Sequence, residues 1–394
     1  MVSDIQHTIR FASEHNLHLV VKNTGNNRTV VGGIGAGGSV GASGGWPLGG
    51  GHSILSHFYG LGVDNILQLT VVLPNASHVV ANAFENTDLF WALRGGGGPS
   101  FGVVTSTTYK TYPNPPYTAA FYAATADSPE SYLTLFETFN QHHNAVSDAG
   151  WSGFWPFINN TLFLTLLAQG VPPVNASSNA TLEAFFMESR SIPGVDVSLA
   201  ISVSYPSFDN WYINNFINSS NGFGFNYTVG DMGGIRVAVS SWLIPRTLFD
   251  TNATELAKAF VNIPSGRPFM VGGGAVAAID PDSAAAAPAW RTAITDMTLA
   301  DAWNETSTPA QIQSVKQSVF EQIQPLRELG PIPAGGQYLN EPDFLEPDWQ
   351  GAYWGSHYPR LLAIKKAIDP HDLFIVFKGV NSEQWDEEVV CKTV

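Results

Sequence analysis

The sequence of 394 residues predicts an α+β protein, and three features support this prediction. Two glycine-rich runs, at residues 44–53 and 94–102, enclose a strand-like apolar segment at 65–73. A proline-rich stretch at 112–116 interrupts strand and helix patterns alike. Beyond it, helix-like and strand-like segments alternate as far as about Gly330. We therefore expect a glycine-loop region followed by a separate α+β body.

The region before the proline stretch predicts short elements. Ser3 and Asp4 can cap a first helix that buries Ile5, Ile9 and Ala12 on one side. The other expected elements are strands at 17–22, 61–73, 79–83 and 103–110, and a helical turn at 86–93.

The region after the proline stretch predicts longer elements. Ser128-Pro129 and Thr308-Pro309 combine a cap residue with a first-turn proline, so each should begin a helix. Strands are expected at 154–169, 236–244 and 269–276, with the glycines at 272–274 forming a bulge or a close contact. The aromatic segment 335–385, with a helix at 359–368, should fold back onto another domain.

Composition excludes several classes of partner. The chain has 18 basic and 33 acidic residues, a formal net charge of −15, and no Lys/Arg block. Nucleic acids and anionic membranes bind clustered positive charge, so neither is expected as a partner. No apolar window is long enough to span a membrane. Cys391 is the single cysteine, which excludes an internal disulfide framework and a cysteine metal site.

Asn-X-Ser/Thr triplets favour N-glycans and a secreted protein. They begin at nine positions, against about three expected by chance: Asn27, Asn75, Asn159, Asn175, Asn179, Asn218, Asn226, Asn252 and Asn304. Chance in an Asn-rich chain is the alternative. The start, Met1 to Gln6, has no signal-peptide pattern, so we expect the natural N-terminus to be missing.

The first glycine run indicates a cofactor loop. Residues 44–53 contain five glycines in ten positions, a composition that lets the backbone take positive φ angles and approach a flat or phosphorylated group closely. A flexible linker is the alternative, but a linker would not carry Trp46, Leu48 and His52.

Four motifs in order resemble the FAD-linked oxidases of the berberine-bridge-enzyme-like group, within the vanillyl-alcohol-oxidase (VAO, PCMH-type) flavoproteins. They are residues 40–53, residues 59–65, residues 88–98, and Tyr338-Leu339-Asn340 together with Tyr353-Trp354-Gly355. The resemblance extends from Ser3 to about Trp385 and is closest to fungal secreted members.

The resemblance implies three regions. Residues 1–113 would be an incomplete PCMH-type FAD-binding domain, 114–330 an α+β substrate domain with an antiparallel sheet, and 331–394 a segment packing on the FAD domain. Backbone amides of glycine loops would hold the FAD pyrophosphate. The residues implied to face FAD are Ser39, Val40, Gly41, Gly44, Gly45, Gly50, Gly51, His52, Asp64 and Val104.

The sequence also departs from the family. Members usually attach the flavin to a histidine in a Gly-His-Asp context and, in some, to a cysteine; here Gly25-Asn26-Asn27 and the region near Gly37 hold neither. We therefore expect a segment of some tens of residues to be absent, and any FAD to bind non-covalently. His52 and His57 are expected to be structural or supporting residues.

The implied reaction is oxidation of a C–H bond alpha to oxygen or nitrogen in a small molecule (an alcohol, a sugar or a secondary metabolite), with dioxygen as acceptor. Tyr338 would be the base and Asn340 would position the substrate or the flavin edge. A phenol ordinarily titrates near pH 10, so Tyr338 would need a neighbour that lowers its pKa. A packed aromatic is the alternative for Tyr338, and the role of His357 is open.

Two other classes remain open: a catalytically silent member without FAD, and a secreted glycan-binding protein. A hydrolase is disfavoured because the sequence has no Gly-X-Ser-X-Gly motif. No metal site is expected, since His142-His143 is an adjacent pair without a third ligand in view.

Overall fold

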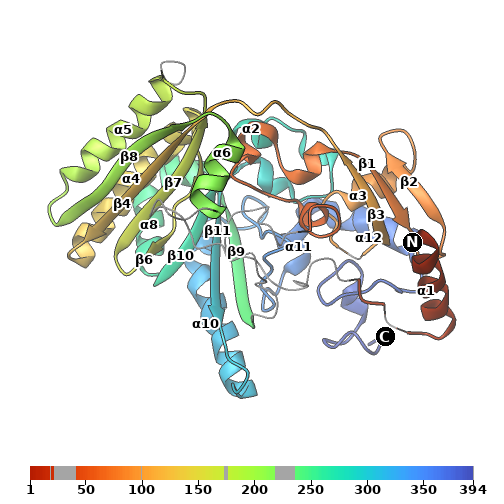
Figure 1. The fold of residues 1–394 in the computed structure, drawn as a ribbon. Coiled ribbons are helices and arrows are strands. Elements are labelled where there is room, and N and C mark those ends of the chain that lie inside the picture. Colours follow the sequence, from red (N-terminus) through yellow and green to blue (C-terminus); the bar gives the residue numbers. More distant parts are fainter. Residues whose placement is uncertain (18, 22–40, 99, 173–175, 218–235, 394) are drawn as a thin grey trace.

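The structure is a computed structural model that describes residues 1–17, 19–21, 41–98, 100–172, 176–217 and 236–393. Within them, the strands form two antiparallel sheets, one of three strands and one of eight. Figure 1 shows the small sheet beside both chain ends and the large sheet on the opposite side of the molecule. The α+β class predicted from the sequence is confirmed. No helix among the described residues is long and apolar enough to cross a bilayer.

The small sheet has the order β2-β1-β3. β1 places Leu69 and Val71 in the core, and α1 packs nearby through Ile9 and Ala12. The elements before the proline stretch are α1 (Val2–Glu14), η1 (Trp46–Gly49), α2 (Ser56–Tyr59), η2 (Gly62–Asn65), β1 (Ile66–Val72), β2 (His78–Asn82), α3 (Thr87–Leu93) and β3 (Val103–Tyr109).

Three predictions for this region need correction. The first helix has Met1 as its N-cap, so Ser3 and Asp4 lie inside the helix. No strand forms at the described residues among 17–22: Leu17 and Val20 are exposed, and no described strand pairs with this segment. The strand expected from Leu61 begins at Ile66, because residues 62–65 form a 3-10 turn around the side chain of Asp64. The strands near 79–83 and 103–110 and the helix near 86–93 are confirmed.

The large sheet has the order β8-β4-β7-β5-β10-β11-β9, with β6 pairing to β10 and β7. Its strands are β4 (Tyr117–Ala126), β5 (Ser152–Phe154), β6 (Phe157–Ile158), β7 (Thr161–Gln169), β8 (Val195–Tyr205), β9 (Val237–Pro245), β10 (Ser265–Met270) and β11 (Ala293–Ala302). The remaining elements of this region are α4 (Pro129–Asp148), α5 (Ala176–Arg190), α6 (Phe208–Tyr212), η3 (Ile213–Ile217), α7 (Arg246–Thr251), α8 (Ala253–Val261), α9 (Gly274–Ala277), η5 (Pro281–Ser283), η6 (Pro288–Arg291) and α10 (Pro309–Leu329).

Helices α4, α5, α8 and α10 cover one face of the large sheet (Figure 1). The predicted starts of α4 and α10 are confirmed: the hydroxyls of Ser128 and Thr308 accept hydrogen bonds from the backbone N–H of Ser131 and Gln311. Buried aromatic rings fill the layer between helices and sheet, including Phe136, Phe139, Trp155, Phe185 and Phe260. Such burial of large rings supplies most of the stabilisation of this layer.

The opposite face of the sheet packs against the glycine-rich region and the C-terminal segment. Alternate residues of β4 show the two faces: Tyr117 and Phe121 belong to this side, whereas Tyr122 belongs to the helix side. Phe269 of β10 and Tyr338 lie in the same buried cluster as Leu61 and Val63. The region before the proline stretch is therefore joined to the large sheet by a continuous apolar interface.

The predicted strand at 269–276 ends early. β10 stops at Met270, and Gly273 and Gly274 have φ angles of +68° and +44°, which lead into α9. A Cβ on Gly272 would lie 2.2 Å from the carbonyl oxygen of Ala293. The close contact expected at these glycines is present, but the prediction that the strand continues beyond Met270 is wrong.

The C-terminal segment returns to the glycine-rich region, with α11 (Trp349–Trp354), η7 (Gly355–His357), α12 (Tyr358–Ile368) and η8 (Ser382–Gln384). Trp354 Nε1 donates to the carbonyl oxygen of Gly95 at 3.0 Å. The buried Lys365 ammonium donates to the carbonyl oxygen of Ser100 at 2.8 Å and to Asp369 at 2.6 Å. The division at 113 and 330 stays a prediction; β3 ends at Tyr109 and β4 begins at Tyr117, on either side of the proline stretch.

Candidate active site

The second half of the first glycine run forms a tight buried turn. η1 ends at Gly49, and Gly50 and Gly51 follow with φ angles of +125° and +79°, which residues with a side chain rarely adopt. Val63 and Gly62 donate their backbone N–H to the carbonyl oxygens of Gly50 and Gly51, at 3.0 and 2.6 Å. The turn is therefore fixed on both sides, and it places His52 inside the protein.

The Tyr338-Leu339-Asn340 motif lies directly on this turn. Asn340 Nδ2 donates to the carbonyl oxygen of Trp46 at 3.0 Å and to the phenol oxygen of Tyr338 at 2.6 Å. A Cβ added to Gly49 would lie 2.3 Å from Asn340 Oδ1, so a side chain has no room there. The structure thus brings together two motifs that are almost 300 positions apart, one predicted to bind FAD and one predicted to be catalytic.

Tyr338 is buried, and two opposing influences act on its phenol. Burial is the largest and raises the pKa of Tyr338, and the charges of Glu341 and Asp296 raise it further. Hydrogen bonds from Asn340 and from the Gly51 backbone lower the pKa because they stabilise the phenolate. The net direction is upward, so Tyr338 is a neutral phenol in the structure described here. The neighbours that the sequence argument required are present, but burial outweighs them.

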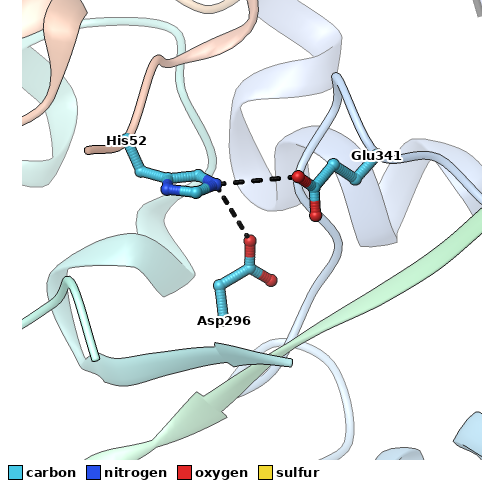
Figure 2. A group of neighbouring side chains, drawn as sticks. All are labelled: His52, Asp296 and Glu341. Atoms are coloured by element: carbon cyan, nitrogen blue, oxygen red, sulfur yellow. Dashed lines mark ion pairs between the residues drawn. The ribbon is translucent and has the colours of Figure 1, made fainter. Parts of the chain in front are cut away.

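His52, Asp296 and Glu341 form a buried cluster beside Tyr338 (Figure 2). His52 Nε2 lies 3.6 Å from Asp296 Oδ2 and 3.8 Å from Glu341 Oε1. Asp296 is fully buried, and neither of its carboxylate oxygens has a hydrogen-bond partner among the described residues. Burial, followed by the charge of Glu341, raises the pKa of Asp296 well above its usual value. We refer to these three residues as the His52 cluster.

Neighbouring side chains position the His52 cluster. Thr298, two residues beyond Asp296 on β11, donates its hydroxyl to Glu341 Oε2. Ser241 of β9 donates to the backbone carbonyl of Glu341 at 3.1 Å and accepts from the Tyr338 N–H at 3.0 Å.

Aromatic rings enclose the His52 side chain. Its ring centroid lies 4.8, 5.1 and 5.8 Å from those of Tyr338, Phe269 and Trp290. The site therefore combines a phenol, an imidazole and two carboxylates in a setting that excludes bulk water, which is the combination proton-transfer sites use.

Sequence reasoning missed Asp296 and Glu341. Glu341 follows directly on the Tyr-X-Asn motif, so its position was a usable signal. Asp296 is the sole charged residue of the run Ala293–Leu299 in an otherwise apolar or Thr-bearing strand, and a buried acid of that kind is a marker of function.

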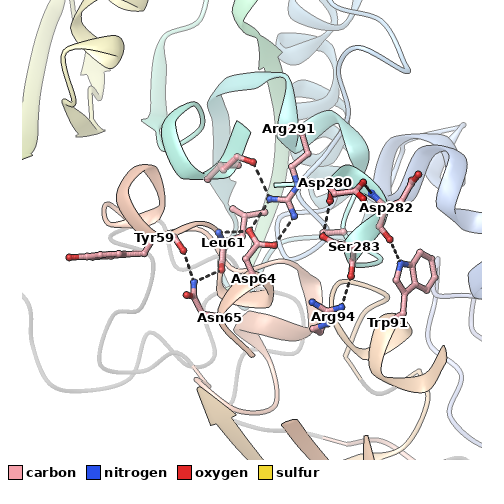
Figure 3. Close-up of polar contacts among 12 residues, drawn as sticks. Tyr59, Leu61, Asp64, Asn65, Trp91, Arg94, Asp280, Asp282, Ser283 and Arg291 are labelled. Atoms are coloured by element: carbon pink, nitrogen blue, oxygen red, sulfur yellow. Dashed lines mark hydrogen bonds and ion pairs between the residues drawn. The ribbon is translucent and has the colours of Figure 1, made fainter. Parts of the chain in front are cut away.

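Asp64, predicted to face FAD, forms a buried ion pair. Its two oxygens lie 2.7 and 2.8 Å from the guanidinium nitrogens of Arg291, and Oδ2 also accepts the Leu61 N–H at 2.8 Å (Figure 3). Asn65 Nδ2 donates to the carbonyl oxygens of Tyr59 and Leu61, both at 2.9 Å. These contacts lock the 59–65 motif onto the large-sheet region; whether Asp64 also meets a cofactor stays a prediction.

The second glycine run packs against the loop that carries η5. Trp91 Nε1 donates to the carbonyl oxygen of Asp282 at 2.8 Å, and the Arg94 guanidinium donates to that of Ser283 (Figure 3). A Cβ on Gly95 would lie 2.1 Å from the Ala286 nitrogen, which explains the glycine there. His357 contacts the same loop, through Asp282 Oδ1 and the Ala286 carbonyl oxygen, and so has a structural position.

Other predicted cofactor residues lie in several places. The backbone N–H groups of Gly45 and Trp46 donate to the Gly41 carbonyl oxygen, so residues 41–46 form a compact turn. Val104 pairs with Val71 within the small sheet. Ser39, Val40 and the residues near 25–37 lie outside the described residues. His57, expected to be structural, forms a hydrogen bond at 3.1 Å through Nδ1 with the carbonyl oxygen of Gly272.

The described residues leave space for a cofactor group beside Gly98. Among them, a Cβ added to Gly98 would find a single atom within 4 Å, the Gly44 carbonyl oxygen at 3.6 Å. Most other glycines of the two runs that the structure describes are packed against protein atoms instead. Gly98 is therefore the glycine of the second run with most room for a phosphate group beside it.

Comparison with known proteins gives consistent results. The family model described as "Berberine and berberine like" matches residues 337–381. An uncharacterized FAD-linked oxidoreductase of Arthroderma benhamiae is 31% identical over 99% of this chain and 77% of its own length. A VAO-type flavoprotein oxidase of Thermothelomyces thermophilus is 28% identical over 98% of this chain and 75% of its own.

Solved structures show the same fold. The VAO-type flavoprotein MtVAO615 of Myceliophthora thermophila superposes with a TM-score of 0.82 at 24% identity, covering 98% of this chain and 79% of the other. A glucooligosaccharide oxidase of Acremonium strictum gives a TM-score of 0.70 at 23% identity, covering 90% of this chain and 73% of the other.

Proposed function

The chain belongs to the FAD-linked oxidoreductases of the berberine-bridge-enzyme-like, VAO-type group, and on that premise we propose that it binds FAD and oxidises a small molecule at a C–H bond next to oxygen or nitrogen. Dioxygen is the proposed acceptor. The substrate is proposed to be an alcohol, a sugar or a secondary metabolite. Two structural neighbours are named as oxidases of glucooligosaccharide and chitooligosaccharide, which supports including sugars.

One observation carries the proposal: Asn340 Nδ2 donates a hydrogen bond to the Tyr338 phenol oxygen at 2.6 Å. A donor directed at this oxygen stabilises negative charge on it, which is what a base at that atom requires. We propose that Tyr338 Oη, having first released its own proton, accepts the proton of the substrate hydroxyl or amine as a phenolate, and that Asn340 positions that oxygen. Burial raises the pKa of Tyr338 in the structure described here, so this role requires the pKa to fall when FAD and substrate bind. Bound FAD would supply the acceptor for the hydride.

The remaining residues have supporting roles in this proposal. The aromatic rings of Phe269 and Trp290 exclude water from the reaction. Gly98, which has space beside it among the described residues, would offer its backbone to the phosphates. We propose non-covalent binding of FAD, since the sequence offers no attachment histidine or cysteine at the family's positions.

Secretion and N-glycosylation are also proposed. Among the described acceptor asparagines, Asn75, Asn159 and Asn304 are exposed, as a glycan requires. The division into an FAD-binding region (1–113), a substrate region (114–330) and a returning C-terminal segment (331–394) is part of the same proposal. Its support is that each sheet lies wholly on one side of the proline stretch.

An absorption spectrum tests the cofactor. Protein expressed in a eukaryotic secretory host, purified and incubated with excess FAD, should retain the visible bands of oxidised flavin after gel filtration. Acid precipitation should leave the yellow colour in the supernatant, because no covalent bond holds it. A folded protein that stays colourless after FAD loading would refute the oxidase and support the silent-member alternative, whereas yellow in the pellet would refute non-covalent binding alone.

A further inference from the structure

The His52 cluster has features that proton transfer does not require. It joins one imidazole nitrogen and two carboxylate oxygens from residues far apart in the chain, and these three ligand atoms all lie within 4.8 Å of one another. The three side chains are buried. We propose that His52, Asp296 and Glu341 bind a divalent transition-metal cation, with Zn²⁺ as the best match. This proposal is independent of FAD binding and departs from the expectation of no metal site, which rested on the His142-His143 pair.

The distances within the cluster match a metal site better than hydrogen bonds. His52 Nε2 lies 3.6 Å from Asp296 and 3.8 Å from Glu341, beyond the range of an N–H···O hydrogen bond. Zinc bonds to nitrogen and oxygen measure about 2.0–2.2 Å, so two ligands of a tetrahedral zinc lie roughly 3.3–3.5 Å apart. The two distances to His52 would have to shorten by a few tenths of an ångström, and the separation of the two carboxylates, which is within 4.8 Å, by up to about 1.5 Å, to place the three atoms around one cation.

The charges of the cluster also favour a dication. Once both carboxyl groups have released their protons, two carboxylates and a neutral imidazole carry two negative charges, which one divalent cation balances. Within the described residues, Asp296 and Glu341 each form their ion pair with His52. Arg291, the nearby buried guanidinium, already pairs with Asp64 at 2.7 Å. Asp296 is left with two unpartnered oxygens, and a buried carboxylate without compensation is costly.

The surroundings hold one of the three ligands directly. Thr298 donates to the Glu341 oxygen that faces away from His52, whereas His52 Nδ1 has no hydrogen-bond partner among the described residues. The imidazole and the carboxylates are a ligand mixture typical of zinc and of the other first-row cations. Three protein ligands leave a fourth position for water or a substrate oxygen, as in catalytic zinc sites.

Measuring the metal content of the protein tests the proposed zinc site directly. The full-length protein, stripped with EDTA and dialysed against Zn²⁺, should contain about one zinc ion per chain by plasma mass spectrometry. Asp296→Asn, Glu341→Gln and His52→Gln should each weaken zinc affinity at least about 10-fold, because each removes a ligand. Asp343→Asn is the matched control: Asp343 is a buried acid two residues from Glu341, and its loss should leave zinc affinity unchanged.

Thermal unfolding gives a second readout and controls for folding. Zn²⁺ should raise the Tm of the wild type and of Asp343→Asn, but not that of the three cluster variants. Stoichiometry well below one, or zinc binding that survives in all three variants, would overturn the proposal and leave the cluster as a proton-sharing group. None of these measurements uses flavin absorbance or turnover, so their failure is distinguishable from failure of the proposed oxidase.

Discussion

The two faces of β11 have opposite characters. Thr295 and Met297 point to the helix layer, whereas Asp296 and Thr298 point to the glycine turn and the C-terminal segment. Each face also meets one buried histidine, His143 on the helix side and His52 on the other. One strand thus serves a closed core on one side and the candidate active site on the other, through the alternation of its side chains.

The helix-side histidine behaves as a core residue. His143 stacks on Phe249 at 3.8 Å, and its Nε2 hydrogen-bonds with the Thr295 hydroxyl at 2.9 Å. Burial, assisted by the positive charge of Arg246, lowers the pKa of His143 to about 3, so the ring stays neutral. His52 instead faces two carboxylates, one of which has unpartnered oxygens. The contrast teaches that two buried carboxylates beside one imidazole, rather than a buried histidine as such, mark the functional face.

The largest expected effect is a loss of activity, and only substitutions on the side of β11 that carries the candidate active site should cause it. Tyr338→Phe should lower turnover of a substrate by about 10²–10⁴-fold, because the phenol oxygen is lost while the ring remains. Stability should change little. The matched control is Tyr122→Phe, a buried tyrosine on the helix side that stacks on Phe186 at 5.3 Å. Steady-state kinetics that show equal losses in both variants would break the comparison.

In the core on the helix side, substitutions should lower stability and leave activity largely unchanged. Trp155→Ala should reduce the free energy of unfolding by about 3–5 kcal/mol, since the buried indole contacts Phe139 and Phe260 at centroid distances of 5.1 Å. Activity per folded molecule should persist. Phe163→Ala, a 38% exposed ring on β7, serves as control and should cost far less in urea denaturation.

His143 predicts a pH dependence of stability. Its pKa is about 3 in the folded protein and near 6.5 when unfolded, so its contribution is complete above pH 6.5 and declines as the pH falls toward 3. At 1.36 kcal/mol per pH unit, lowering the pH from 6.5 to 4.5 should cost about 2.7 kcal/mol from this residue.

Urea denaturation at several pH values, compared between wild type and His143→Gln, isolates the contribution of His143 to stability, because a glutamine side chain does not take up a proton. His142→Gln is the control: it removes the adjacent histidine, which is partly exposed and lies 2.7 Å from Glu188. Equal pH slopes in the wild type and His143→Gln would show that His143 is not a buried neutral base.

The smallest expected effect concerns Asp296. In EDTA-treated protein, Asp296→Asn should leave the free energy of unfolding unchanged or raise it by about 1 kcal/mol, because it removes an uncompensated buried carboxylate. Asp369→Asn should instead destabilise by about 3–5 kcal/mol, since it leaves the buried Lys365 without its partner at 2.6 Å. Equal destabilisation by the two substitutions would mean that Asp296, like Asp369, stabilises the fold as one partner of a buried ion pair.

Local patterns predicted much of the fold. The caps at Ser128 and Thr308 identified the starts of α4 and α10, because a cap and a first-turn proline act within one turn of helix. Predictions failed where a distant partner decided the outcome. Residues 17 and 19–21 have strand-like composition but are not paired with any strand in the described part of the chain, and β10 ends where Gly272 packs against Ala293.

The sequence by itself determined the glycine turn at 49–51, the starts of α4 and α10 and the Tyr338-Asn340 motif, because each depends on residues that are neighbours along the chain. Only the tertiary structure decided that Asn340 rests on the glycine turn, and that His52, Asp296 and Glu341 meet in one buried cluster. Contacts across hundreds of positions follow from how the sheet, the turn and the C-terminal segment pack, and no local pattern encodes that packing.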